Sequence, residues 1–169
     1  WTTNNIPDLS GKVFIITGAN AGLGFEASKE VARKGAKVIM ACRSMDKAQA
    51  ALSQIGAAIP GASVEIMQLN LASLKSIHQF AEQFKAKYDR LDVLLNNAGI
   101  MFLPERRETE DGFELTLGTN LLGHFALTGL LLDVLKGTPG SRVVNVTSFA
   151  HTGGEMDFDD LMFENKEFN

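Results

Sequence analysis

The chain has 169 residues, of which 45% are hydrophobic, and its formal net charge at pH 7 is -4. This length allows one packed domain, and this composition excludes a disordered polymer. A mildly acidic balance without a basic run argues against a nucleic-acid partner, because neutralising phosphates needs clustered Lys and Arg. The single cysteine, Cys42, excludes an internal disulfide, and no Cys or His spacing predicts a metal site.

We expect a soluble, cytoplasmic protein that has no membrane partner. The longest apolar stretch, Leu127–Leu135, is interrupted by polar residues and is shorter than the roughly 20 residues of a membrane-spanning helix. No signal peptide is evident, and a lone cysteine suits a reducing compartment. The sequence begins at Trp1 rather than at a methionine and ends at Asn169 within an acidic and aromatic stretch, so we expect it to be part of a longer product.

Apolar runs of strand length alternate with apolar patterns of helical spacing along the chain. Short continuous runs between glycine or proline breaks predict strands, and the fourth run, Leu91–Leu95, predicts a strand that is buried on both faces. Apolar residues that recur every three or four positions predict helices with one buried face, two of them capped by Ser44 and Ser73. The predicted strands cover Gly11–Thr17, Lys37–Ala41, Val64–Leu69, Leu91–Leu95 and Arg142–Thr147.

The region Phe113–Leu135 predicts a long helix of the core, because it is apolar nearly all round. It contains Gly118, Gly123 and Gly129, where we expect another backbone to approach closely. Five strands that alternate with helices require right-handed crossovers. The predicted fold is therefore α/β, a doubly wound parallel sheet or Rossmann fold in a single domain.

Candidate binding residues follow the ends of the predicted strands. The glycine-rich turn follows the first strand, Asn70 the third, Asn96–Gly99 the fourth and Ser148 the fifth. Ligands of a doubly wound sheet bind beyond the carboxyl ends of the strands, where the strand order reverses. We therefore expect these residues to collect at one edge of the sheet.

The glycine-rich turn, residues 17–24, reads Thr-Gly-Ala-Asn-Ala-Gly-Leu-Gly and opens a helix. Backbone N–H groups in the first turn of a helix have no partner within the helix, and with the positive end of the helix dipole they bind phosphate oxygens. Glycine is expected here because a Cβ would block the approach of the ligand. The turn predicts a diphosphate site, and a purely structural turn is the alternative.

The pattern T-G-x-x-x-G-x-G at residues 17–24, with Asn-Asn-Ala-Gly at residues 96–99, resembles the short-chain dehydrogenase/reductase family. The resemblance implies an NAD(P)-binding Rossmann domain over residues 1–169 that lacks the last strands of the family fold. It implies an oxidoreductase that moves hydride between nicotinamide and a carbonyl or alcohol, and it allows a homo-oligomer. The residues expected at the cofactor are Thr17, Gly18, Asn20, Gly22, Leu23, Gly24, Arg43, Ser44, Asn70, Leu71, Asn97, Ala98, Gly99 and Val146.

The residues after the second strand favour NADP, with NAD as the alternative. An NAD site of this architecture offers the ribose a carboxylate about 20 residues beyond the glycines, whereas an NADP site offers a cation. Arg43 stands in this window and no carboxylate precedes Asp46, so Arg43 is the expected partner of the 2′-phosphate; a solvent-facing arginine is the alternative. Asn70 replaces the aspartate usual at the adenine, where it either accepts the adenine amino group or forms a turn with its own backbone.

Ser148 and Asn120 match the catalytic serine and the helix asparagine of the family. The resemblance implies that Ser148 holds the substrate carbonyl and Asn120 supports a proton relay; a turn serine and a structural amide are the alternatives. The family also uses a tyrosine followed four residues later by a lysine. The only tyrosine, Tyr88, has no such lysine, so we exclude it as the catalytic acid, and the sequence given lacks the pair that turnover needs.

The histidines and the cysteine have plain structural interpretations. We interpret His124 as a packed helix residue, His78 as a solvated one and Cys42 as a buried small residue rather than a reactive thiol. His151, three residues after Ser148, stands near the expected cleft, where contact with a substrate is the less favoured of two interpretations.

The acidic and aromatic segment Asp157–Leu161 resembles the retinol-dehydrogenase-like branch of the family, which includes the WW-domain oxidoreductases. The runs Ala-Cys-Arg at residues 41–43 and Gly-His-Phe at residues 123–125 do so too. In this branch, such a segment precedes the catalytic tyrosine. If the polypeptide truly ends at Asn169, the alternative is a non-catalytic dinucleotide-binding sensor or interaction module.

Overall fold

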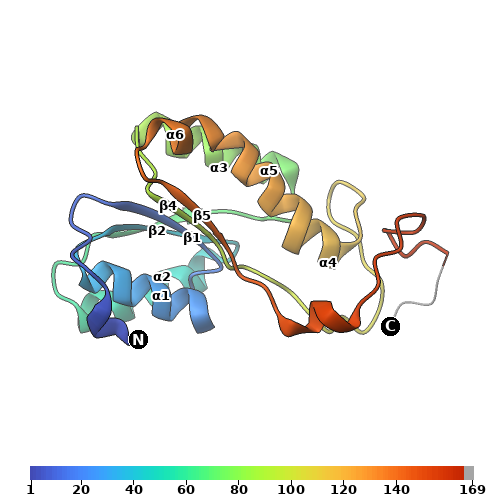
Figure 1. The fold of residues 1–169 in the computed structure, drawn as a ribbon, viewed down its shortest axis with the longest axis horizontal. Coiled ribbons are helices and arrows are strands. Elements are labelled where there is room, and N and C mark those ends of the chain that lie inside the picture. The colour runs from blue at the N-terminus through green and yellow to red at the C-terminus, as the bar shows by residue number, and fades with distance from the viewer. Residues whose placement is uncertain (166–169) are drawn as a thin grey trace.

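The computed structural model describes residues 1–165 as a three-layer α/β/α arrangement (Figure 1). Five parallel strands lie in the order β3-β2-β1-β4-β5, which confirms the predicted doubly wound sheet. The reversal of strand order lies between β1 and β4. The strands are β1 (Val13–Thr17), β2 (Lys37–Cys42), β3 (Val64–Gln68), β4 (Val93–Asn96) and β5 (Arg142–Asn145).

Helices cover both faces of the sheet (Figure 1). Ser44 and Ser73 cap the helices that begin at Met45 and Leu74, as predicted, because their hydroxyls accept the N–H groups of Lys47 and Ser76. One face carries α1 (Gly22–Arg33) and α2 (Met45–Ala58), and the other carries α3 (Leu74–Lys87), α5 (Gly123–Leu130) and α6 (Leu132–Gly137). Short helical turns lie at Thr3–Asn5, Leu115–Leu117 (α4), Gly118–Leu122 and Phe149–Gly153.

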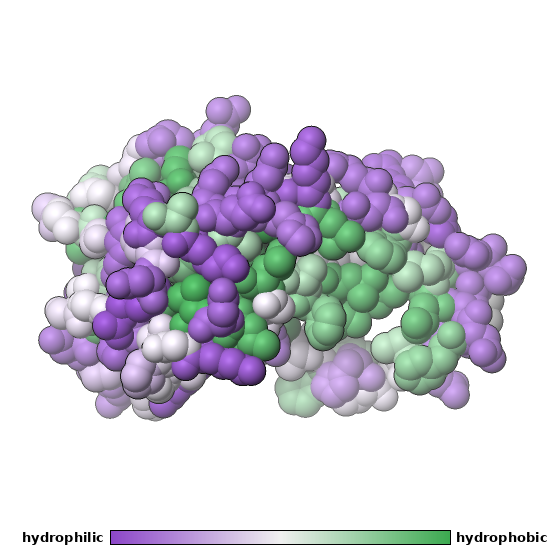
Figure 2. All heavy atoms as spheres, turned by 90° about the horizontal axis from the view of Figure 1, so that it is seen from above, coloured by the Kyte–Doolittle hydropathy of each residue, from purple (hydrophilic) through white to green (hydrophobic). Residues whose placement is uncertain are grey.

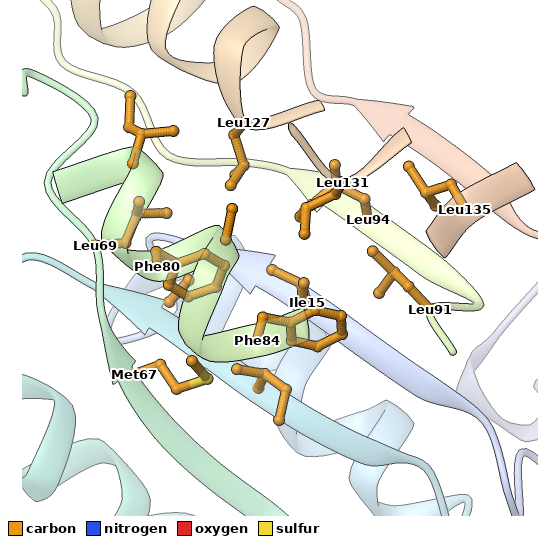
Figure 3. Packing of buried hydrophobic residues seen from close by; sticks show 14 of the residues in the cluster. Ile15, Met67, Leu69, Phe80, Phe84, Leu91, Leu94, Leu127, Leu131 and Leu135 are labelled. Atoms are coloured by element: carbon orange, nitrogen blue, oxygen red, sulfur yellow. The ribbon is translucent and has the colours of Figure 1, made fainter. Parts of the chain in front are cut away.

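The central strands separate two hydrophobic cores. Neighbouring residues of a strand point to opposite faces, so Ile15 packs toward α3 and α5 while Ile16 packs toward α1 and α2. Phe80 and Phe84 of α3 fill the first core beside Leu127 of α5 (Figure 3). These side chains have no more than 1% of their surface exposed. The sheet and its covering helices therefore form a rigid support for the strand ends.

The predicted long core helix is wrong in part, because the chain is broken into segments over this region. A π-helical turn, Gly118–Leu122, precedes α5, and the backbone bends at Leu131 before α6 begins. Leu127 faces the core, but Leu121 and Phe125 are 52% and 78% exposed. The helix lies in an outer layer, so only one stripe of it meets the sheet, and Figure 2 shows hydrophobic residues at the surface of this face.

Only one of the three glycines in this region, Gly123, has the predicted close backbone neighbour, while Gly118 packs against side chains. A Cβ on Gly118 would collide with the Thr109 side chain, and one on Gly123 would collide with the backbone oxygen of Leu71. A Cβ on Gly129 would meet nothing within 4 Å, so the prediction fails there.

An ion cluster fixes the amino ends of the two central strands. The Asp92 carboxylate, only 5% exposed, accepts the N–H of Val13 at 2.9 Å, Nζ of Lys12 at 3.1 Å and Nη2 of Arg90 at 2.7 Å. Burial alone would raise the pKa of Asp92. The bonds from Arg90, Val13 and Lys12 outweigh burial and lower that pKa from 3.8 to about 2.

Within residues 1–165, each helix is too short or too polar to cross a bilayer. The same part of the chain contains no group of three or more His, Cys, Asp or Glu side chains that could hold a metal ion.

Candidate functional site

The glycine-rich turn joins the carboxyl end of β1 to the first turn of α1. Gly18 and Gly22 have φ angles of +64° and +54°, in the left-handed region that glycine adopts without strain. A Cβ on Gly18 would lie 2.9 Å from Cα of Ala98, and one on Gly24 would lie 2.5 Å from the oxygen of Gly18. The space beside Gly22 is open to 4 Å. At Gly22, the absence of a side chain leaves room for a ligand, as predicted. At Gly18 and Gly24, it instead allows close packing within the protein.

The first turn of α1 has the features of an anion site. Its N-cap, Ala21, makes no side-chain cap hydrogen bond, so the first N–H groups of the helix are not satisfied from there. Leu23, in this first turn, is 74% exposed. An α-helix of 12 residues also directs the positive end of its dipole toward this point.

Thr17 supports the turn from beneath rather than lining it. The residue is fully buried, and its Oγ1 accepts the N–H groups of Asn97 and Ala98, both at 2.9 Å. In return, the Asn97 side chain donates Nδ2–H to the backbone oxygen of Thr17 at 2.9 Å. The Thr17 side chain has no exposed surface and supports the turn from within, so a role of Thr17 at the cofactor stays a prediction.

Cys42 ends β2 beneath the same turn. Burial raises the pKa of its thiol to about 11, and the nearby N–H groups of Ala19 and Asn20 offset this only in part. A thiol with so high a pKa is not ionised at neutral pH, in agreement with the interpretation of Cys42 as a buried small residue.

Asn20, one of the predicted cofactor residues, is half-buried within the glycine-rich turn.

Arg43 and Ser44 follow β2 at the carboxyl edge. Arg43 is exposed, and no carboxylate pairs with it within residues 1–165. The Ser44 hydroxyl accepts the N–H of Lys47 at 3.5 Å and so caps α2. An unpaired guanidinium at the start of a capped helix is a favourable position for a phosphate.

Asn70 forms a turn with its own backbone, one of the two predicted roles. Its Oδ1 accepts the N–H of Ala72 at 3.1 Å, and its Nδ2 donates to Oε1 of Glu110 at 3.3 Å. An amide oxygen has a second lone pair, so an adenine contact stays a prediction. Leu71 is only 7% exposed and packs in the core beneath α5, so its side chain is not a surface for the cofactor.

A cavity of about 600 Å³ lies at the carboxyl ends of β4 and β5, next to α5. We call it the edge cavity. Arg43, Ser44 and Asn70 do not line it. It brings together six of the predicted residues, Asn97, Ala98, Gly99, Asn120, Val146 and Ser148.

Asn120 and Ser148 face the edge cavity in different ways. The Asn120 side chain forms two hydrogen bonds with Ile100, since Oδ1 accepts its N–H at 2.9 Å and Nδ2 donates to its oxygen at 2.8 Å. Ser148 is exposed, and its Oγ accepts the N–H of Ala150 at 3.2 Å. The serine therefore caps a turn and keeps its hydroxyl hydrogen for another acceptor. His151 bonds to the oxygen of Ser148 and does not line the cavity.

Tyr88 lies at the C-cap of α3, away from the edge cavity, in agreement with its exclusion as the catalytic acid. Its hydroxyl donates to Oε2 of Glu65 at 2.8 Å. Burial and the Glu65 carboxylate both raise the pKa of this phenol. It lines no part of the edge cavity.

The edge cavity also contains two buried side chains: Asn96, which the sequence placed among the candidate residues after the fourth strand, and His124, which it did not. His124, taken as a packed helix residue, also bonds through both ring nitrogens. Asn96 donates Nδ2–H groups to Thr128 and Asn145, and its buried Oδ1 has no hydrogen-bond partner among residues 1–165. The spacing of four residues between Asn120 and His124, one helical turn, was the available signal.

Comparisons with known proteins indicate the same family as the geometry of the glycine-rich turn and the sheet. The family model for short chain dehydrogenase matches residues 12–158. Human retinol dehydrogenase 13 is 47% identical over 161 residues, which are 95% of this chain and 48% of that protein. The chain thus spans about half the length of this curated relative.

Solved structures agree. An uncharacterised protein from Mycobacterium paratuberculosis superimposes with a TM-score of 0.87 at 42% identity, covering 99% of this chain and 57% of that one. A short chain dehydrogenase from Escherichia coli, solved as a complex with NADPH, superimposes with a TM-score of 0.75 at 26% identity, covering 92% of this chain and 66% of that one. From the matched residues, the sheet order and the turn after β1, we conclude that this chain belongs to the short chain dehydrogenase family.

Proposed function

We propose that the protein carrying this chain is an NADP-dependent oxidoreductase that transfers hydride between the nicotinamide and a carbonyl or alcohol substrate. The observation that carries this proposal is one edge of the sheet where three groups follow three different strands: a helix N-terminus without a side-chain cap, an arginine that pairs with no carboxylate of residues 1–165, and an exposed serine. Bound NADPH would supply the hydride. The residues of this chain hold the cofactor and orient the substrate oxygen.

Each group has a part in binding. The first-turn N–H groups of α1 receive the diphosphate beside Gly22, where no Cβ fills the space. Arg43 receives the 2′-phosphate through charge-assisted hydrogen bonds, which supports NADP over NAD. The Escherichia coli relative in complex with NADPH is in agreement with this choice.

The substrate oxygen is proposed to meet Ser148. Its hydroxyl hydrogen is free to donate, and such a bond strengthens as charge develops on the oxygen during hydride transfer. Apolar side chains, among them Ile100, Met101 and Phe125, line the same cavity. Since the relatives include retinol dehydrogenases, we propose a retinoid alcohol or aldehyde as the first substrate to test.

The cofactor choice is tested by fluorescence titration of the protein with NADPH and with NADH. We expect NADPH to bind more tightly, and we expect Arg43→Ala to remove most of the preference by weakening NADPH alone. Arg33→Ala is a matched control, because Arg33 is a partly exposed arginine on α1 that pairs with Glu30. A preference that is unchanged in Arg43→Ala would remove this residue from the proposal.

The reaction is tested by following NADPH absorbance with retinaldehyde in the full-length protein that carries this chain, because the sequence given lacks the tyrosine and lysine pair that turnover needs. Oxidation of NADPH with formation of the alcohol is the expected result. Tight NADPH binding without oxidation of NADPH by retinaldehyde or by a panel of simpler ketones and aldehydes would instead favour a dinucleotide-binding sensor.

A further inference from the structure

His124 is a buried titratable side chain to which the proposed reaction assigns no role. It lies on α5, is 6% exposed and lines the edge cavity. Its Nε2 lies 2.9 Å from Oγ1 of Thr17, and its Nδ1 lies 2.9 Å from the backbone oxygen of Asn120. One imidazole therefore joins the end of β1 to the π-helical turn before α5.

Counting donors and acceptors fixes which nitrogen carries the hydrogen. The backbone oxygen of Asn120 can only accept a hydrogen bond, so Nδ1 of His124 must be the donor in that bond. Oγ1 of Thr17 already accepts two N–H groups, so it has only its own hydrogen left to give. The oxygen of Leu95 is 3.4 Å away, whereas Nε2 of His124 is at 2.9 Å. Nε2 is therefore an acceptor, and the ring is neutral with its hydrogen on Nδ1.

The surroundings of the ring agree with a neutral form. Burial lowers the pKa of His124, and the bond to Asn120 offsets this only in part. A positive charge on the ring would also place a second hydrogen against the Thr17 hydroxyl, whose acceptor positions are already taken.

The two partners of His124 hold opposite ends of one short segment, Asn97–Ile100. Thr17 binds the N–H groups of Asn97 and Ala98, and the Asn120 side chain binds the N–H and the oxygen of Ile100. The hydrogen bonds thus form a closed ring through Thr17, His124, Asn120 and this segment. The segment lines the edge cavity and packs against Gly18 of the glycine-rich turn.

We propose that His124 is a positioning residue that joins these two attachments and so presets the segment Asn97–Ile100 against the glycine-rich turn for cofactor binding. The inference rests on the proposed function, because the segment is among the residues expected at the cofactor. Its basis is the pair of bonds at Nδ1 and Nε2, neither of which a hydrophobic side chain can form.

Three substitutions separate the two bonds. Counting bonds from the backbone, Asn places its amide nitrogen where Nδ1 is, and Gln places its amide oxygen where Nε2 is. His124→Asn therefore keeps a donor for Asn120, His124→Gln keeps an acceptor for Thr17, and His124→Phe fills the space with neither. His78→Gln is the control, because His78 is exposed on α3.

Three measurements test the inference. In nitrogen-15 NMR of the unmodified protein, with His78→Gln and His151→Gln used for assignment, we expect His124 to be protonated at Nδ1 only. In amide hydrogen exchange, we expect Asn97 and Ala98 to exchange at least about tenfold faster in His124→Phe and His124→Asn, but near the original rate in His124→Gln. In titrations, we expect the NADPH Kd to rise about tenfold in His124→Phe and less in the two amide variants.

The outcomes distinguish this inference from the proposed function. Protonation of Nε2, or equal exchange rates for Asn97 and Ala98 in all variants, would overturn the inference whether or not NADPH binds. If every variant loses stability equally and the NADPH Kd does not change, His124 only fills space. Failure of the unmodified protein to bind NADPH would count against the proposed function, while the NMR and exchange results would still decide the hydrogen-bonded ring. If the variants do not fold, the NMR result on the unmodified protein decides alone.

Discussion

Gly24→Ala tests the structural reason for the last glycine of the turn. An added Cβ would lie 2.5 Å from two atoms, the backbone oxygen of Gly18 and Nδ2 of Asn97. Neither can move freely, since the oxygen belongs to the turn itself and the amide donates to the oxygen of Thr17 at 2.9 Å. Overpacking of this kind costs about 1–3 kcal/mol.

Gly56→Ala is the matched control. Gly56 also lies inside a helix, α2, but a Cβ there would meet nothing within 4 Å. Replacing glycine by alanine within a helix stabilises a protein by roughly 0.5–1 kcal/mol. The same chemical change is therefore expected to have opposite signs at the two positions.

Urea unfolding and NADPH titration measure the two effects. We expect the urea midpoint to fall in Gly24→Ala and to rise in Gly56→Ala, with similar slopes. The added Cβ displaces the turn, so its amides no longer point correctly at the diphosphate. We therefore expect NADPH binding to lose about 1.4 kcal/mol in Gly24→Ala, which is a tenfold rise in Kd. A Gly24→Ala protein as stable as the original, with unchanged affinity, would refute the packing argument.

Three further predictions concern catalysis, pH and the core. Ser148→Ala should lower kcat by about a hundredfold or more in the retinaldehyde assay and leave the NADPH Kd within about twofold, and equal activity would remove Ser148 from the reaction. Asp92 has a folded pKa of about 2 against 3.8 unfolded, so its contribution is complete above about pH 5 and is lost as the pH falls toward 2. Asp92→Asn should therefore cost about 1–2 kcal/mol at pH 7 and flatten the acid limb of the stability curve; an unchanged acid limb would contradict this. Leu127→Ala should lower the unfolding free energy by about 2–5 kcal/mol, whereas exposed Leu121→Ala should change it by less than about 0.5 kcal/mol, and similar costs would contradict the assigned helix faces.

The fold and the arrangement of the strand ends were predictable because they depend on local patterns. The apolar run at residues 37–41 forms the predicted strand, and the caps Ser44 and Ser73 bond as their positions predict. The gathering of the candidate residues at the carboxyl edge of the sheet could be predicted from the topology. Once the strands are parallel, the turn after β1 and the asparagines after β4 must lie at one side.

What the sequence could not determine depends on contacts between distant residues. The packing of Gly24 on Asn97, the bond from His124 to Thr17 and the burial of Leu71 beneath α5 each join segments far apart in the chain. The break in the predicted long helix has the same cause. Its apolar composition does not reveal which stripe meets the sheet or that a π-helical turn precedes α5.

A crystal structure of the protein with NADPH tests the central claim most directly. We predict that the diphosphate lies against the first-turn N–H groups of α1 beside Gly22 and that the 2′-phosphate contacts Arg43. An NADPH molecule bound elsewhere on the protein, or a well-ordered turn that holds only solvent at saturating NADPH, would contradict the account.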